Sequence, residues 1–119
     1  LTTDPFRRTH RDHRMTGQVT IDAVFPYARD PLHFAELTQE GLEPHKVGWI
    51  YLWGAEEPTT FVDIKDTLEL KVESLLKHVS QFTHREGQRG QFVRDGAKRT
   101  GERGSMEYAE GFRVIEFRR

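Results

Sequence analysis

Val47-Gly48-Trp49-Ile50-Tyr51-Leu52-Trp53 is a nearly unbroken apolar and aromatic run near the middle of the chain. Because it lacks regular alternation with polar residues, it predicts a strand buried on both faces, as in a parallel sheet between helices. A second short strand is expected over residues 60–64, after Pro58. A strand of this kind needs covered faces and paired edges, and this chain supplies few further elements. We therefore expect a missing N-terminal half or a partner chain to pack there.

Helical patterns on both sides of this run predict an α/β fold. The clearest helix is expected over residues 65–82, with one apolar stripe at helical spacing formed by Leu68, Val72, Leu75, Leu76, Val79 and Phe82. Upstream, Met15, Val19 and Ala23 predict a helix from about residue 12, which Pro26 should end or kink. A short helix should open at Pro31 and close at Gly41.

The remaining segments predict loops and one edge strand. Residues 1–9 should form a loop leading into the first helix. Residues 83–105 are basic and rich in glycine, which favours a solvated, mobile loop with at most one short helix. Such a loop could act as a lid. Residues 108–117 alternate from Phe112 onward, which indicates an edge strand.

The composition limits the classes of function. A chain of 119 residues with 35% hydrophobic residues suits one domain. Its net charge of -1 disfavours nucleic acid as a partner, and it has no apolar run long enough to span a membrane, so cytoplasm is the default location. With no cysteine, any metal must be held by imidazole and carboxylate. The start at Leu1 suggests a fragment or a processed chain, with a tag-cleaved or mature end equally open.

His10-Arg11-Asp12-His13 carries the strongest chemical signal. Neutral imidazole is a good zinc ligand, and a nearby carboxylate commonly orients a histidine. The pair should sit on a loop and the first turn of a helix. By spacing alone, a functional site and a solvent-exposed polar loop are equally supported. The isolated histidines His33, His45 and His84 are expected on the surface.

Four segments together resemble one enzyme family. The segment His10-Arg11-Asp12-His13-Arg14-Met15-Thr16-Gly17 resembles the HxDHxxTG signature of the LmbE-like or PIG-L zinc-dependent N-deacetylases. In the order of that family follow Ala28-Arg29-Asp30-Pro31, then Lys71 with His78-Val79-Ser80-Gln81, then Tyr108-Ala109-Glu110-Gly111-Phe112. The resemblance implies a Rossmann-like layered α/β fold, of which residues 1–119 form the C-terminal part of a single domain.

The resemblance also implies roles for particular residues. His13 would bind zinc, His10 would stabilise the oxyanion and Asp12 would orient His10, in the hydrolysis of an acetamide on an N-acetylglucosamine-type sugar conjugate. Arg29 would either hydrogen-bond the substrate or stabilise a helix end. His78 and Gln81 would border the cleft, although periodicity alone makes Lys71 and His78 ordinary polar edges of one helix.

One family motif is absent. The AHPDDE segment, which supplies two further zinc ligands and the general base, occurs nowhere in residues 1–119. We therefore expect the chain alone to bind zinc weakly and to lack deacetylase activity. The alternative is a non-catalytic remnant that acts as a binding or assembly module. The sugar aglycone, iron or manganese in place of zinc, and a homo-oligomeric state all stay open.

Overall fold

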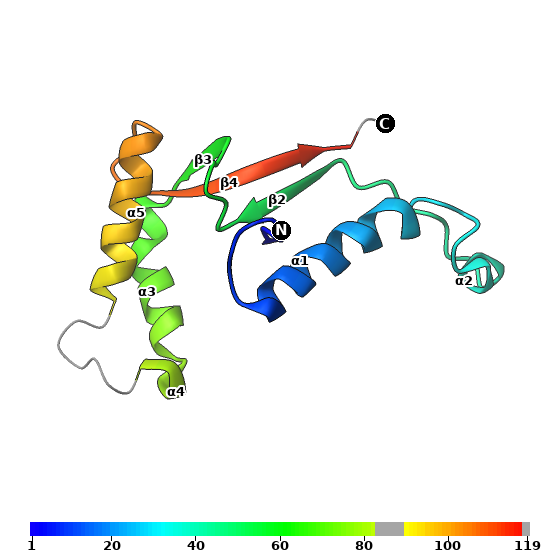
Figure 1. Ribbon diagram of the computed structural model, residues 1–119, viewed down its shortest axis with the longest axis horizontal. Coiled ribbons are helices and arrows are strands. Elements are labelled where there is room, and N and C mark those ends of the chain that lie inside the picture. The colour runs from blue at the N-terminus through cyan, green and yellow to red at the C-terminus, as the bar shows by residue number, and fades with distance from the viewer. Residues whose placement is uncertain (83–89, 118–119) are drawn as a thin grey trace. The chain divides into compact units, whose positions relative to one another are not determined.

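The computed structural model describes residues 1–82 and 90–117, which form two compact units. The first unit contains Leu1–Thr59 together with the chain from Phe112, and the second contains Thr60–Gly111. Figure 1 traces their helices and strands in chain order. The prediction for residues 83–89, including His84 and the first part of the expected loop, lies outside the described residues.

Three strands form the sheet of the first unit. β1 (Thr2–Thr3) pairs in parallel with β2 (Trp49–Trp53), and β2 pairs antiparallel with β4 (Ala109–Glu116). The sheet is therefore mixed, whereas a parallel sheet was predicted. The prediction of a plain loop over residues 1–9 is also wrong, because Thr2 and Thr3 are buried and pair with Leu52 and Trp53. Two threonines are too short a signal for a strand in a sequence.

β2 is buried on one side only in the described chain. Ile50 and Leu52 are buried, whereas Trp49, Tyr51 and Trp53 are between 39% and 54% exposed. The prediction that both faces of this strand are buried is wrong for the described residues. Because tryptophan and tyrosine count as apolar, the alternation of buried and exposed positions does not show in the sequence. Their polar atoms nevertheless allow these side chains to face water.

α1 (Arg11–Asp22) packs against β1, and its start matches the predicted start near residue 12. It continues into a π-helical turn over Ala23–Tyr27, where Phe25 leaves helical geometry just before Pro26. The buried residue of α1 is Gly17, while Met15 and Val19 are exposed. The predicted apolar face is therefore not the face that packs in the described chain.

α2 (Ala35–Gln39) begins four residues later than predicted. Residues 31–34 form turns instead, in which the Leu32 amide donates to the Asp30 carboxylate at 2.9 Å and Phe34 adopts a left-handed conformation with φ 54°. Gly41, with φ +87°, follows the end of this helix as expected.

The second unit packs helices around a small core. β3 (Thr60–Asp63) is hydrogen-bonded to β4, and a short 3₁₀ turn over Lys65–Thr67 leads into α3 (Leu68–Leu76). Figure 1 shows α3 beside α5 (Gln91–Arg103). The core consists of Ile64, Leu68, Val72, Val93 and Ala97.

The long helix predicted over residues 65–82 is interrupted. α3 ends at Leu76, and α4 (Val79–Phe82) starts after a break at Lys77 and His78. Neither glycine nor proline marks this break in the sequence.

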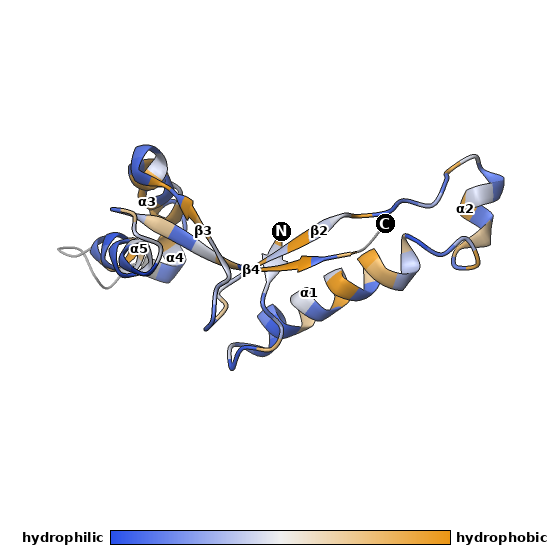
Figure 2. Cartoon of the chain, turned by 90° about the horizontal axis from the view of Figure 1, so that it is seen from above, coloured by the Kyte–Doolittle hydropathy of each residue, from blue (hydrophilic) through white to orange (hydrophobic). Residues whose placement is uncertain are grey.

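The loop predicted over residues 83–105 is wrong for residues 91–103, which form α5. Figure 2 shows α5 as largely hydrophilic, which explains why composition suggested a loop. Its buried face consists of Val93, Ala97 and Gly101, spaced four residues apart. Because Gly101 faces the Met106 carbonyl, where an added Cβ would lie 2.6 Å from that oxygen, glycine here allows close packing.

β4 confirms the predicted terminal strand, but the prediction of an edge strand is wrong, because β4 lies between β2 and β3 in the order of the sheet. Residues 109–111 belong to the second unit, where β4 bonds to β3, and residues 112–116 pair with β2 in the first unit.

Within the described ranges, no helix is long and apolar enough to cross a membrane.

Candidate functional site

His10 caps α1 with its side chain. Its Nδ1 accepts a hydrogen bond from the Asp12 amide at 3.1 Å, in the position where serine, threonine or aspartate usually serves. The Asp12 carboxylate lies 3.7 Å from the same nitrogen. Because Nδ1 accepts this hydrogen bond, it carries no proton in the neutral ring, whose proton is then on Nε2 and available for donation.

His13 lies on the first turn of α1, close to His10. The two ring centroids are 6.1 Å apart, and the centroids of the His13 and Trp53 rings are 5.7 Å apart, with the two planes at 65°. The His10 and Asp12 side chains are about 70% exposed. The three polar groups therefore share one accessible surface beside the aromatic end of β2.

This surface lies at the carboxyl ends of the two parallel strands. β1 and β2 end at Thr3 and Trp53, which are paired, and α1 follows β1 after a short segment. Ligands of α/β proteins commonly bind outside the carboxyl ends of parallel strands. The free amides at the start of a helix also favour negative charge there. The position is therefore suited to a developing oxyanion.

The described residues do not form a complete zinc site. Across residues 1–82 and 90–117, no three histidine, aspartate or glutamate side chains are grouped to hold a metal ion. A catalytic zinc needs three protein ligands. His13 and its neighbours supply part of such a set, so we derive no catalytic step through a metal from them.

Arg29 is not brought to this surface. It follows the π-helical turn at the far end of α1 from His10, and its guanidinium lies 5.6 Å from the centre of the Phe25 ring. The amide of Arg29 donates to the Pro26 carbonyl.

His78 and Gln81 belong to the second unit. His78 lies in the break between α3 and α4, so the prediction that Lys71 and His78 project from one continuous helix is wrong. The His78 amide donates to Leu75 at 3.1 Å, and the Gln81 amide donates to His78 at 3.0 Å.

Lys71 instead forms an ion pair with Glu110 of β4. Both residues lie in segments that carry the family resemblance, yet no sequence pattern indicates that they pair. Their side chains are 45% and 36% exposed, so the contact contributes little to stability by itself.

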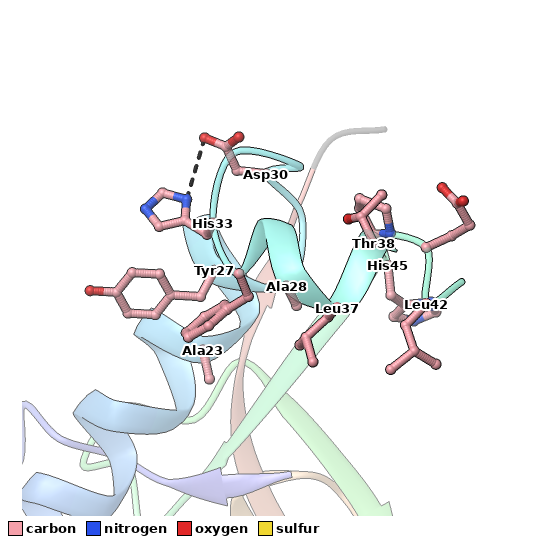
Figure 3. Close-up of a pocket in the computed structure, with 12 residues that line it drawn as sticks. Ala23, Tyr27, Ala28, Asp30, His33, Leu37, Thr38, Leu42 and His45 are labelled. Carbon is pink, nitrogen blue, oxygen red and sulfur yellow. Dashed lines mark ion pairs between the residues drawn. The ribbon is translucent and has the colours of Figure 1, made fainter. Parts of the chain in front are cut away.

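A separate pocket of about 350 Å³ lies among residues 23–45 of the first unit (Figure 3). Its walls include Tyr27, His33 and Leu37, with Asp30 and His45 among its polar residues. The His33 Nδ1 is buried 3.5 Å from the Asp30 carboxylate and has no hydrogen-bond partner. His45 is exposed as predicted, whereas the surface prediction for His33 is only partly right.

Comparisons with known proteins point to deacetylases. No family model matches the chain. Over 107 residues, the chain is 31% identical to a diacetylchitobiose deacetylase of Thermococcus kodakarensis. This match covers 89% of this chain and 40% of that relative. It is 32% identical to the N,N'-diacetylchitobiose deacetylase from Pyrococcus horikoshii, solved with its inhibitor MPG, with a TM-score of 0.81 over 97% of this chain and 44% of that one.

The structural match confirms the predicted α/β fold as part of an LmbE-like fold. The chain spans less than half the length of both relatives. The sequence similarity also confirms the predicted likeness to deacetylases that act on N-acetylated sugars, as their names state.

Proposed function

We propose that this chain contributes the oxyanion-stabilising group and one metal ligand to an N-deacetylase of the LmbE-like or PIG-L type. The observation that carries the proposal is the fixed arrangement of His10, Asp12 and His13 at the carboxyl ends of β1 and β2. The similarity to two diacetylchitobiose deacetylases supports an N-acetylglucosamine-type sugar conjugate as the substrate.

His10 would donate from Nε2 to the oxygen of the acetamide as that oxygen gains charge. The bond from the Asp12 amide to Nδ1 supports this role, because it leaves the proton on the outward nitrogen. A donor fixed in advance stabilises the transition state without reorganising during the reaction. Asp12 would keep the ring oriented, through the bond from its amide to Nδ1 and through its carboxylate 3.7 Å from that nitrogen.

His13 would supply one imidazole to zinc, which is the cofactor that we propose. The other ligands and the general base would come from further polypeptide, either a missing N-terminal half or a partner chain. The exposed aromatic side of β2 supports such a covering part. Arg29, His78 and Gln81 stay predicted substrate neighbours.

The test measures acetate released from N,N'-diacetylchitobiose by the longest polypeptide that the gene encodes, with the 119-residue chain assayed beside it. We expect activity in the longer protein and none in the chain alone. Replacing one oxyanion donor commonly lowers kcat by about 100- to 1000-fold, so we expect a loss of that size for His10→Gln.

The matched control is His45→Gln, which changes an exposed histidine of the first unit in the same way. It should keep full activity. A His10→Gln variant with unchanged kcat in an active protein would contradict the proposed role.

A non-catalytic binding or assembly module is the second candidate. The lack of a three-ligand group within the described parts of the chain favours it. If the longest gene product binds no zinc and releases no acetate, this candidate replaces the enzyme.

A further inference from the structure

We propose that Asp4 is a positioning residue, which, paired with Arg113, fixes the segment that carries His10 and His13 beside Trp53. The catalytic consequence of this inference rests on the proposed function, whereas the geometry that it predicts does not.

Asp4 is a buried acidic residue directly after β1. It is 4% exposed, and its Oδ1 accepts hydrogen bonds from the Phe6 amide and from Arg113 Nη2, both at 2.9 Å. Its own amide donates to the Trp53 carbonyl at 2.9 Å. A carboxylate out of water is retained only when it is paired and hydrogen-bonded. Asp4 therefore holds its segment to two different strands.

Arg113 closes this segment from the other side. It stands on β4 opposite Leu52, and its guanidinium lies 4.8 Å from the centre of the Phe6 ring while it donates to Asp4. The planar cation thus contacts both ends of the turn formed by residues 4–6.

Arg7 adds a second attachment three residues before His10. Its Nη1 donates to the Gly54 carbonyl at 2.9 Å, just beyond the end of β2. The stretch from Asp4 to Arg7 is therefore bonded at both of its ends to the neighbourhood of Trp53, and His10 follows three residues later.

Gly17 is the residue at which α1 contacts this segment. A Cβ at Gly17 would lie 2.4 Å from the Thr3 carbonyl oxygen and 3.0 Å from Pro5 Cδ, so the helix touches the backbone around Asp4. The Thr2 and Thr20 hydroxyls are also hydrogen-bonded, at 3.2 Å. A shift at Asp4 therefore moves the start of α1, and with it His13 relative to Trp53.

The experiment uses Asp4→Asn in the 119-residue chain, observed by NMR of the histidine ring protons. Asparagine keeps the shape and one acceptor oxygen but loses the charge. Because the His13 and Trp53 rings are 5.7 Å apart between centroids, the His13 ring protons carry a ring-current shift, which we expect to move toward the value of free histidine in the variant. Glu69→Gln, which removes a carboxylate paired with Arg94 in the second unit, is the matched control and should leave this shift unchanged.

Arg113→Lys keeps the proposal testable if Asp4→Asn does not fold. Lysine retains the charge but not the planar contact with Phe6, so we expect a smaller movement of the same protons. A purely structural role would lower the melting temperature of either variant without moving the His13 signals, and that result would overturn the inference.

Activity gives an independent reading. In an active longer protein, Asp4→Asn should lower kcat by about 10- to 100-fold with little change in KM, as the loss of an outer partner of a site commonly does. An unchanged kcat together with moved His13 signals would overturn the catalytic consequence. If neither the 119-residue chain nor the longer protein releases acetate, the proposed function fails. The NMR shift of the His13 ring protons then still tests whether Asp4 positions this segment.

Discussion

The two units of this chain bury their apolar residues to different extents. The core of the second unit joins Ile64, just after β3, to α3 and α5 through residues that are at most 9% exposed. In the first unit, Ile50 and Leu52 are buried, but Trp49, Tyr51 and Trp53 on the same strand are open to solvent. The second unit thus has a closed core, with Val62, Leu70, Val79 and Phe92 exposed outside it, whereas the first unit presents an aromatic face.

This difference distinguishes a core that the residues of the second unit bury themselves from an aromatic face of the first unit that is open to contact with another polypeptide. Large contiguous apolar surfaces are uncommon on soluble proteins unless they mark an interaction site. The aromatic face adjoins the candidate site through the contact of Trp53 with His13. The candidate site therefore lies beside aromatic side chains that the described residues leave partly exposed.

The largest expected effect is in the closed core. Leu68→Ala removes a side chain that is 4% exposed, and burial of this kind is commonly worth about 2–5 kcal/mol. We expect a loss of that size in urea unfolding. Leu70→Ala, on the same helix at 66% exposure, is the matched control and should cost less than about 0.5 kcal/mol. Equal losses in the two variants would show that the second unit has no closed core.

A smaller effect is expected on the open face of β2. Trp49→Thr keeps a residue that favours strands and should cost less than about 1 kcal/mol in the 119-residue chain, because the indole is already half exposed. Ile50→Thr, one residue along and 3% exposed, should cost clearly more. Sedimentation of the Trp49 variant should also show less self-association. A large loss at Trp49 would mean that this face is already covered.

The smallest effect concerns an exposed ion pair of the second unit. Hydrogen bonds from Arg94, at 2.7 and 2.5 Å, lower the pKa of Glu69. The pair therefore stabilises the fold above the unfolded pKa of Glu69, near 4.5, and this contribution is lost as the pH falls through the lower folded pKa. The difference in melting temperature between wild type and Glu69→Gln should be small at neutral pH and vanish in acid.

Glu73→Gln, at another exposed position of α3, is the control for this titration. Its replacement leaves the bond between Arg94 and Glu69 in place, so it should not reproduce the difference caused by Glu69→Gln. A gap between wild type and Glu69→Gln that widens in acid would contradict the sign of the pKa change.

Local signals predicted much of the fold. The start of α1 at His10, the disturbance at Pro26, β3 and β4 all follow from caps, prolines and alternation that act over a few residues. α5 was missed because its buried face uses alanine and glycine as well as Val93, and small residues give almost no hydropathy signal. The burial of β2 was misjudged because it depends on what packs against each side.

The candidate site was also predicted only in part. The proximity of His10, Asp12 and His13 follows from their spacing at the start of one helix. The roles of Asp4 and Arg113 were not predicted, because no local pattern links residues so distant in sequence. The pairing of Lys71 with Glu110 was missed for the same reason.

The bond between Asp4 and Arg113 spans 109 positions of the chain. Contacts of such separation form late in folding, because the entropy of closing the intervening loop must be overcome first. During synthesis, the segment with His10 emerges long before Arg113 does. The segment with His10 and His13 is therefore synthesised before β4, the strand whose Arg113 bonds to Asp4. Until β4 pairs, this bond does not hold the two histidines in position.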